Sequence, residues 1–277
     1  MGKQIGLSER LKLVASFVEP GAVVADVGTD HGYVPIWLVQ EGVAVGGIAM
    51  DVKPGPLERA AAHIVACGLT DRIQTRLGDG LSALSDGEVD TVIIAGMGGP
   101  LITRILTDGL ETARKMKRLI LSPQSEIWIV REFLDRQGFI IEDEGMTEED
   151  GKYYTVIRAR FGSEYIEEGT ENKASEVRTE ENGRMDGMAM PSADENESVN
   201  QRKRLEWKYG KCLLEQKNPV LLEFLEKERE KYRQVLERLN SADGKHGAGN
   251  LRRQARKKEV EEELALIEEA MFGYFGN

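Results

Sequence analysis

The sequence has few of the residues that build zinc sites or disulfide frameworks. Its 277 residues include three histidines and two cysteines, Cys67 and Cys212, which lie far apart in the chain. Zinc sites need pairs of cysteine or histidine ligands at short spacing, and small secreted domains need several cysteine pairs. We therefore expect no metal site, and we interpret both cysteines as free thiols in a reducing compartment.

Long apolar runs are missing as well. No stretch approaches the ~20 apolar residues that a membrane-spanning helix requires, although 40% of the residues are apolar, which allows a sizeable core. The first six residues lack the apolar segment of a secretory signal. We therefore expect a cytoplasmic protein with no membrane partner. Nothing in the sequence indicates a protein partner or an oligomeric state.

Basic side chains are fewer than acidic ones in the chain as a whole, 37 against 48, which gives a net charge of −11. Residues 1–160 carry 17 basic and 23 acidic side chains, residues 161–200 carry 3 and 11, and residues 201–277 carry 17 and 14. The acid is thus concentrated in the middle of the chain, and the C-terminal part is mildly basic. Because nucleic acids respond to local basic patches, the negative total does not exclude an RNA partner.

The glycine pattern that binds dinucleotides, G-x-G-x-x-G, does not occur after the first predicted strand, residues 22–25. Gly28 and Gly32 bracket the turn there, and Asp30 stands where the second glycine would be. A carboxylate beside a pyrophosphate is unfavourable, because both are negatively charged. S-adenosylmethionine (SAM) instead presents an ammonium and a sulfonium, which Asp26 and Asp30 would attract. The turn therefore favours SAM over NAD, and an acidic turn without any ligand is the alternative.

Two further predicted strands also end in a carboxylate. Asp51 lies 23 residues after Gly28, close to the ~20 residues at which a carboxylate binds the ribose hydroxyls of a nucleotide. Capping of the helix predicted over 54–67 is the alternative role for Asp51. The next strand, 73–77, leads into Gly78-Asp79-Gly80, where an acid between glycines suits the amino group of an adenine. Any tight turn could use the same three residues.

Strands and helices alternate along residues 1–162. A helix is predicted after Ser8, which would cap it, and a glycine-rich segment, Gly96-Met97-Gly98-Gly99, follows the strand predicted over 89–95. The other predicted elements are helices at 35–40 and 126–138 and strands at 46–50, 119–121, 139–142 and 152–160, the last two flanking an acidic connection over 144–151. This order predicts an α/β domain with a doubly wound, mostly parallel sheet and one antiparallel strand.

The rest of the chain divides into two parts. Residues 163–204 are poor in large aliphatic side chains and predict an acidic, flexible linker. Residues 205–277 carry two charged amphipathic stretches, which predict a C-terminal coiled-coil hairpin. Two interpretations of this hairpin are open. Its apolar stripes only pack on each other, or the hairpin also binds a nucleic acid through five basic residues, Arg252, Arg253, Arg256, Lys257 and Lys258.

Three features together resemble the bacterial tRNA (adenine-22-N1)-methyltransferase family, often called TrmK. They are Asp-Val-Gly-Thr-Asp-His-Gly-Tyr-Val-Pro at 26–35, Gly-Met-Gly-Gly at 96–99 and the charged helical tail. The resemblance covers about residues 7–162 and resumes near Trp207. It implies a class I SAM-dependent methyltransferase domain with a Rossmann-like sheet, SAM as cofactor, tRNA as partner and a C-terminal domain that helps to hold tRNA. One departure is Gly210-Lys211, where members of the family tend to have Gly-Pro.

The strand-end motifs and the resemblance together give one set of expected cofactor-binding residues, all before residue 100. The set consists of Asp26, Gly28, Thr29, Asp30, His31, Gly32, Asp51, Val52, Asp79, Gly80, Ala95, Gly96 and Met97.

Methylation of a ring nitrogen requires little acid–base catalysis by the protein. N1 of adenine has its own lone pair, so catalysis depends mainly on placing nucleophile, methyl group and sulfur in line. The Asn/Asp-Pro-Pro-aromatic motif of exocyclic-amine methyltransferases is absent after the fourth strand, which favours a ring nitrogen as target. A proton must still leave the methylated base, and Asp30 or His31 could accept it. Tyr33 is a candidate stacking surface for the flipped base.

Each of these assignments has an alternative. His31 could be a structural turn residue, and Tyr33 could belong to the core. The whole protein could methylate a small molecule or a protein, or it could bind SAM or tRNA without catalysis. A nicotinamide-dependent oxidoreductase is disfavoured by Asp30. The basic hairpin argues against a small substrate, which would need no long charged extension.

Overall fold

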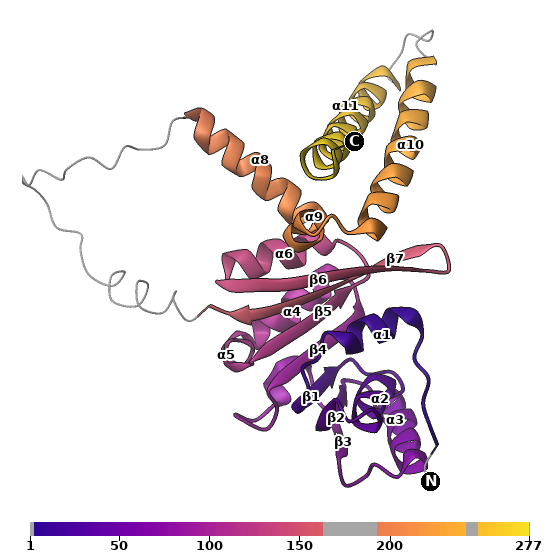
Figure 1. Cartoon of the computed structure of the whole chain (residues 1–277), viewed down its shortest axis with the longest axis vertical. Coiled ribbons are helices and arrows are strands. Elements are labelled where there is room, and N and C mark those ends of the chain that lie inside the picture. Colours follow the sequence, from indigo (N-terminus) through magenta and orange to yellow (C-terminus); the bar gives the residue numbers. More distant parts are fainter. Residues whose placement is uncertain (1–2, 163–192, 242–248, 277) are drawn as a thin grey trace, which may run out of the picture.

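The computed structural model describes residues 3–162, 193–241 and 249–276 (Figure 1). The N-terminal part forms a sheet covered by helices, and the C-terminal helices rise from one side of it. Its elements are α1 (Glu9–Ser16), β1 (Ala22–Val27), α2 (Tyr33–Gln40), β2 (Ala44–Asp51), α3 (Pro54–Cys67), β3 (Ile73–Leu77), a 3₁₀ helix (Gly80–Ala83), β4 (Thr91–Met97), α4 (Gly99–Asp108), α5 (Leu110–Lys115), β5 (Arg118–Pro123), α6 (Ile127–Arg136), β6 (Phe139–Glu149), β7 (Lys152–Phe161), α8 (Ala193–Tyr209), α9 (Lys211–Glu215), α10 (Pro219–Ser241), α11 (Gly249–Ala270) and a π-helical turn (Met271–Phe275).

The sheet has seven strands in the order β3-β2-β1-β4-β5-β7-β6. Pairing is parallel from β3 through to β5, and β7 is antiparallel to both of its neighbours. The doubly wound, mostly parallel sheet with one antiparallel strand is therefore confirmed. The strand order reverses between β1 and β4, and in sheets of this kind ligands bind beyond the carboxyl ends of the strands at that point.

The predicted acidic connection over 144–151 is wrong, because β6 continues to Glu149 and pairs with β7 as far as Lys152. Only Asp150 and Gly151 form the turn, and both have positive φ angles. The acids did not prevent a strand because most of them lie at the edge of the sheet, where charged side chains reach water. Glu144, by contrast, is buried and ion-paired.

Helices cover both faces of the sheet, and alternate residues of each strand supply the two cores. Ile93 of β4 packs in a cluster with Val14 of α1, Ile36 of α2 and Ile64 of α3. Its neighbours Val92 and Ile94 pack on the opposite face with Ile102, Leu106, Val130 and Leu134 of α4 and α6. These strand residues are fully buried. The two-sided burial explains why the sequence of β4 reads as one apolar run.

The C-terminal helices α8 to α11 form a separate part of the molecule, which we call the arm. Their own apolar cluster includes Leu205, Leu214, Leu225, Ile267 and Met271. α10 and α11 lie side by side, with an ion pair between Arg233 and Glu268 at 2.7 Å (Figure 1). The predicted pair of helices is thus present, whereas its coiled-coil character stays a prediction. No helix in the described ranges is long and apolar enough to cross a membrane.

The boundary predicted at 204/205 falls inside α8, which begins at Ala193. Residues 193–204, assigned above to the flexible linker, therefore form the first part of a helix. Most of the linker, 163–192, and the loop between α10 and α11, 242–248, lie outside the described residues. The division of the chain into three parts stays a prediction.

Candidate active site

The turn after β1 is built by two backbone hydrogen bonds to the neighbouring strand. The amides of Gly28 and Thr29 both donate to the carbonyl of Met50 in β2, at 2.8 Å. Gly28 has a φ of +78°, a conformation that L side chains rarely adopt. A Cβ at Gly28 would lie 1.9 Å from Cε of Met97. The glycine-rich end of β4 therefore lies directly against the turn.

A cavity of about 480 Å³ opens at this point, where the strand order reverses between β1 and β4. We call this space the cavity. Its walls include eight residues that the sequence analysis selected: Asp26, Gly28, Thr29, Asp30, His31, Tyr33, Ala95 and Gly96. The structure thus brings the first and fourth strand ends together in one site.

The other predicted cofactor residues lie outside the cavity wall, at neighbouring strand ends. Gly32 is buried, and its amide donates to Thr29 Oγ1 at 3.1 Å, so it shapes the turn. Asp51 ends β2, and Asp79 is exposed at the start of the 3₁₀ helix, with Gly80 buried after it. Val52 is more than half exposed. An elongated ligand would have to extend along this edge of the sheet to reach both the cavity and the ends of β2 and β3.

The side chain of Asp51 contacts the backbone just before α3 and does not cap that helix, whose N-cap residue is Lys53 and which has no side-chain capping hydrogen bond. Its Oδ1 accepts a hydrogen bond from the amide of Lys53 at 2.7 Å, just before α3 begins. The carboxylate is only half-buried, and Oδ2 has no hydrogen-bond partner among the residues that the structure describes. The contact with Lys53 and a role in binding ribose are therefore compatible, because they use different oxygens.

Asp26 is the buried acid of the cavity. The pKa of its carboxyl is raised to about 6: burial raises it most, a hydrogen bond with Thr29 partly opposes this effect, and the charge of Asp51 adds a smaller rise. Removing a carboxylate from water without a cationic partner is unfavourable. A cationic group placed in the cavity would relieve this cost, so Asp26 is suited to hold an ammonium.

Asp30 differs from Asp26 because it is already paired. Its Oδ1 accepts from Arg59 of α3 at 2.6 Å, and its Oδ2 lies 3.3 Å from His31 Nε2. The His31 ring stacks on Tyr33, with centroids 4.9 Å apart and an angle of 11° between the planes. His63 completes the group 5.1 Å from Tyr33, and its Nδ1 donates to the His31 carbonyl at 3.0 Å. Nδ1 of His31 is buried and has no hydrogen-bond partner among the described residues.

One wall of the cavity was missed by the sequence analysis. Gly6, Ser8, Arg10 and Leu11 line it from the N-terminal side, together with Gln124 after β5. Ser8 was expected only to cap α1, and its side chain makes no capping hydrogen bond. Arg10 is the one lysine or arginine in the described wall. Its Nε lies 3.5 Å from Glu149 of β6, and its guanidinium lies over the ring of Tyr154.

The basic residues predicted to bind tRNA lie near the start of α11, at the end of the arm far from the sheet (Figure 1). Arg256, Lys257 and Lys258 each face an acid one turn later, at 3.0, 3.8 and 3.7 Å. Arg253 donates to the carbonyl of Leu239. Arg252 is exposed, and within the described ranges it has no ion-pair partner. Local pairing with acids therefore reduces the charge that this group presents.

Comparison with known proteins assigns the chain to a family. The methyltransferase domain family matches residues 7–157. The tRNA (adenine(22)-N(1))-methyltransferase of Bacillus subtilis (strain 168) is 41% identical over 159 residues, which is 57% of this chain and 67% of that protein. The crystal structure of the B. subtilis m1A22 tRNA methyltransferase TrmK superposes with a TM-score of 0.71 and 30% identity, covering 97% of this chain and 100% of that one.

The structure of Streptococcus pneumoniae Sp1610 in complex with S-adenosyl-L-methionine superposes with a TM-score of 0.70 and 31% identity, covering 96% of this chain and 100% of that one. Sequence and structure therefore agree over the methyltransferase domain, and the structural match extends over the arm. The chain belongs to the methyltransferase domain family and, within it, to the tRNA (adenine-22-N1)-methyltransferases.

Proposed function

We propose that this protein transfers a methyl group from SAM to N1 of adenine 22 in tRNA and works in the cytoplasm. The observation that carries the proposal is the acid-lined cavity at the β1/β4 switch point, where Asp26 is buried and no lysine or arginine of the described residues pairs with it. The absence of a pyrophosphate-binding glycine pattern beside this cavity disfavours a dinucleotide. Membership of the family is the basis for proposing tRNA as the substrate and N1 of adenine 22 as the target atom.

The residues present fit SAM along its whole length. Asp26 would hold the ammonium, and Arg10 would face the carboxylate of the methionine end, since both line the cavity. The free Oδ2 of Asp51 would accept from a ribose hydroxyl, and Asp79 with Gly80 would border the adenine at the end of β3. The backbone of Gly28, Gly96 and Met97 would lie along the cofactor. When bound, SAM supplies an electrophilic methyl group.

The protein's own contribution to the transfer is placement. Ala95, Gly96 and Gln124 form the part of the cavity wall that would receive the target base. His31 would accept the proton that leaves the methylated base, because its Nε2 already faces Asp30 and its Nδ1 has no hydrogen-bond partner in the described part of the chain. Asp30 is paired with Arg59, so it would orient His31 and balance its charge. Tyr33 would offer a ring face beside His31.

The proposal is tested by incubating the protein with methyl-labelled SAM and unmodified tRNA, followed by digestion to nucleosides. We expect label in 1-methyladenosine. Transfer to a small molecule or to protein in a cell extract, without transfer to tRNA, would support a methyltransferase for another substrate. Binding of SAM and tRNA without any transfer would support a non-catalytic module. A His31→Gln variant checks the role of His31: its rate of transfer should fall by more than its affinity for SAM, to which His31 contributes only as one residue of the cavity wall.

A further inference from the structure

A buried ion pair lies where the arm meets the methyltransferase domain. Arg131 belongs to α6 and Glu144 to β6, and their side chains are 2% and 0% exposed. Nε of Arg131 donates to Oε1 of Glu144 at 2.7 Å. Neither residue lines the cavity. The pair therefore has no direct part in binding SAM or the target base.

Each member of the pair also binds the backbone of the arm. Nη1 of Arg131 donates to the carbonyls of Trp207 and Lys208, at 3.0 and 2.9 Å, in the last turn of α8. Oε2 of Glu144 accepts from the amide of Cys212, at 3.0 Å, in the first turn of α9. The last carbonyls and first amides of a helix have no partner within it. One ion pair of the domain thus supplies partners to two helix ends of the arm.

The residue between the two helices must be a glycine for this contact to form. Gly210 has a φ of +91°. A Cβ there would lie 2.6 Å from Oε2 of Glu144 and 2.7 Å from Nη2 of Arg131. Only glycine satisfies both the backbone conformation and the space. The bend between α8 and α9 and the ion pair therefore depend on each other.

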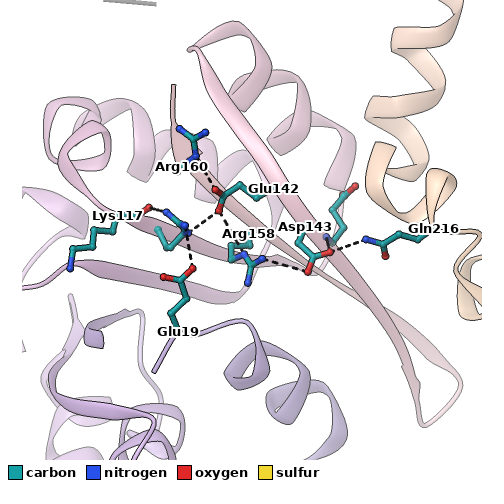
Figure 2. Close-up of polar contacts among 9 residues, drawn as sticks. Glu19, Lys117, Glu142, Asp143, Arg158, Arg160 and Gln216 are labelled. Atoms are coloured by element: carbon teal, nitrogen blue, oxygen red, sulfur yellow. Dashed lines mark hydrogen bonds and ion pairs between the residues drawn. The ribbon is translucent and has the colours of Figure 1, made fainter. Parts of the chain in front are cut away.

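Directional bonding distinguishes this contact from ordinary packing. Replacing a buried ion pair by apolar residues of similar volume often costs no stability. The planar guanidinium, however, presents its donors in a fixed geometry, which apolar side chains lack. Other polar contacts also join the arm to the domain: Lys203 of α8 pairs with Asp135 of α6 at 2.6 Å, Gln216, which follows α9, donates to Asp143 at 3.0 Å (Figure 2), and the Tyr153 hydroxyl donates to Glu223 of α10 at 3.1 Å.

We propose that the Arg131–Glu144 pair positions the arm, so that a tRNA held by the arm presents its target nucleotide to the cavity. Arg131 and Glu144 are positioning residues in this account, because they act through α8 and α9. The inference rests on the proposed function for its consequence in methylation. The fixed direction of the arm is a property of the protein alone and is measured without tRNA.

The test uses the full chain with Arg131→Met combined with Glu144→Leu, which removes the directed bonds and leaves no buried charge unpaired. Spin labels at Glu58→Cys in α3 and Ala255→Cys in α11, both at exposed positions, report the direction of the arm in a background with Cys67→Ala and Cys212→Ser. Pulsed electron paramagnetic resonance then gives the distance distribution between the labels. We expect a clearly broader distribution in the double variant.

The same variant, without labels, should lose at least tenfold in kcat/KM for tRNA, while its Kd for SAM changes less than twofold. Arg160→Met is the matched control: Arg160 pairs with Glu142 inside the sheet, and Glu142 keeps Arg118 and Arg158 as partners (Figure 2). It should leave both measurements unchanged.

If the double variant does not fold, the same measurements are made on Arg131→Lys instead. One ammonium cannot reproduce the guanidinium's contacts to Glu144 and to both carbonyls. A narrow distance distribution together with wild-type kinetics in the deciding variant would overturn the proposal. Failure of the wild-type protein to methylate tRNA would instead overturn the proposed function and leave the distance result standing.

Discussion

Replacing Asp51 tests two contacts of one carboxylate, that of Oδ1 with the amide of Lys53 and that proposed for Oδ2 with ribose. Asp51→Ala removes the acceptor for the amide of Lys53 and also the free Oδ2 proposed to bind ribose. The lost backbone contact should lower the free energy of unfolding by about 1 kcal/mol. A hydrogen bond to a charged group contributes roughly 1.5–3 kcal/mol. Its loss should therefore weaken SAM binding about 10- to 150-fold.

Isothermal titration calorimetry with SAM, combined with thermal unfolding of the free protein, measures both effects. Asp51→Asn is the matched control, because the amide oxygen can still accept from Lys53 while the charge is gone. We expect Asp51→Asn to unfold like the wild type and to bind SAM with intermediate affinity. A folded Asp51→Ala protein with wild-type affinity and reduced stability would refute the ribose role and leave Asp51 with the Lys53 contact alone.

Three further predictions concern the cavity and the arm. Gly28→Val should abolish SAM binding in calorimetry, because valine is strained at a φ of +78° and its Cβ would displace Met97; normal binding would place the ligand elsewhere. The raised pKa of Asp26, about 6 against 3.8, predicts a stability contribution that is present below pH 3.8 and lost as the pH rises through 6. Asp26→Asn should thus raise the melting temperature of the free protein at pH 7.5 and weaken SAM binding; an unchanged melting temperature would contradict the burial argument. Arg252→Gln should reduce the slope of log Kd for tRNA against log salt by about 0.7–0.9, whereas Lys258→Gln, whose charge faces Glu262, should change it little; equal effects would show that the ion pairs do not matter.

The gathering of strand ends at one edge of the sheet could be predicted from local sequence. Asp26 and Gly96 lie near the carboxyl ends of β1 and β4, Gly28 follows β1 directly, and parallel strands bring their carboxyl ends to one edge. The N-terminal wall was missed for a physical reason. Arg10 reaches the cavity through contacts with Glu149 and Tyr154, more than a hundred residues away, and no local pattern encodes that approach.

The N-terminal wall was missed from the sequence, whereas the charge of the arm was overestimated from it. The sequence counts Arg256, Lys257 and Lys258 as a basic cluster, yet each faces a glutamate three or four residues later. Helical spacing could have revealed these pairs, because residues three and four apart share a face. The Arg131–Glu144 pair could not be foreseen in the same way, since its partners Trp207 and Cys212 come from a part of the chain far along the sequence.

The most direct test of the central claim is the position of the methyl group on tRNA. Unmodified tRNA is incubated with the protein and SAM, cut with a base-specific ribonuclease and analysed by fragment mass spectrometry, beside a matched tRNA in which adenine 22 is replaced by guanine. The account predicts one added methyl in the fragment that contains position 22, released as 1-methyladenosine, and none in the substituted tRNA. Equal methylation of both tRNAs, or a methyl at another position, would contradict it.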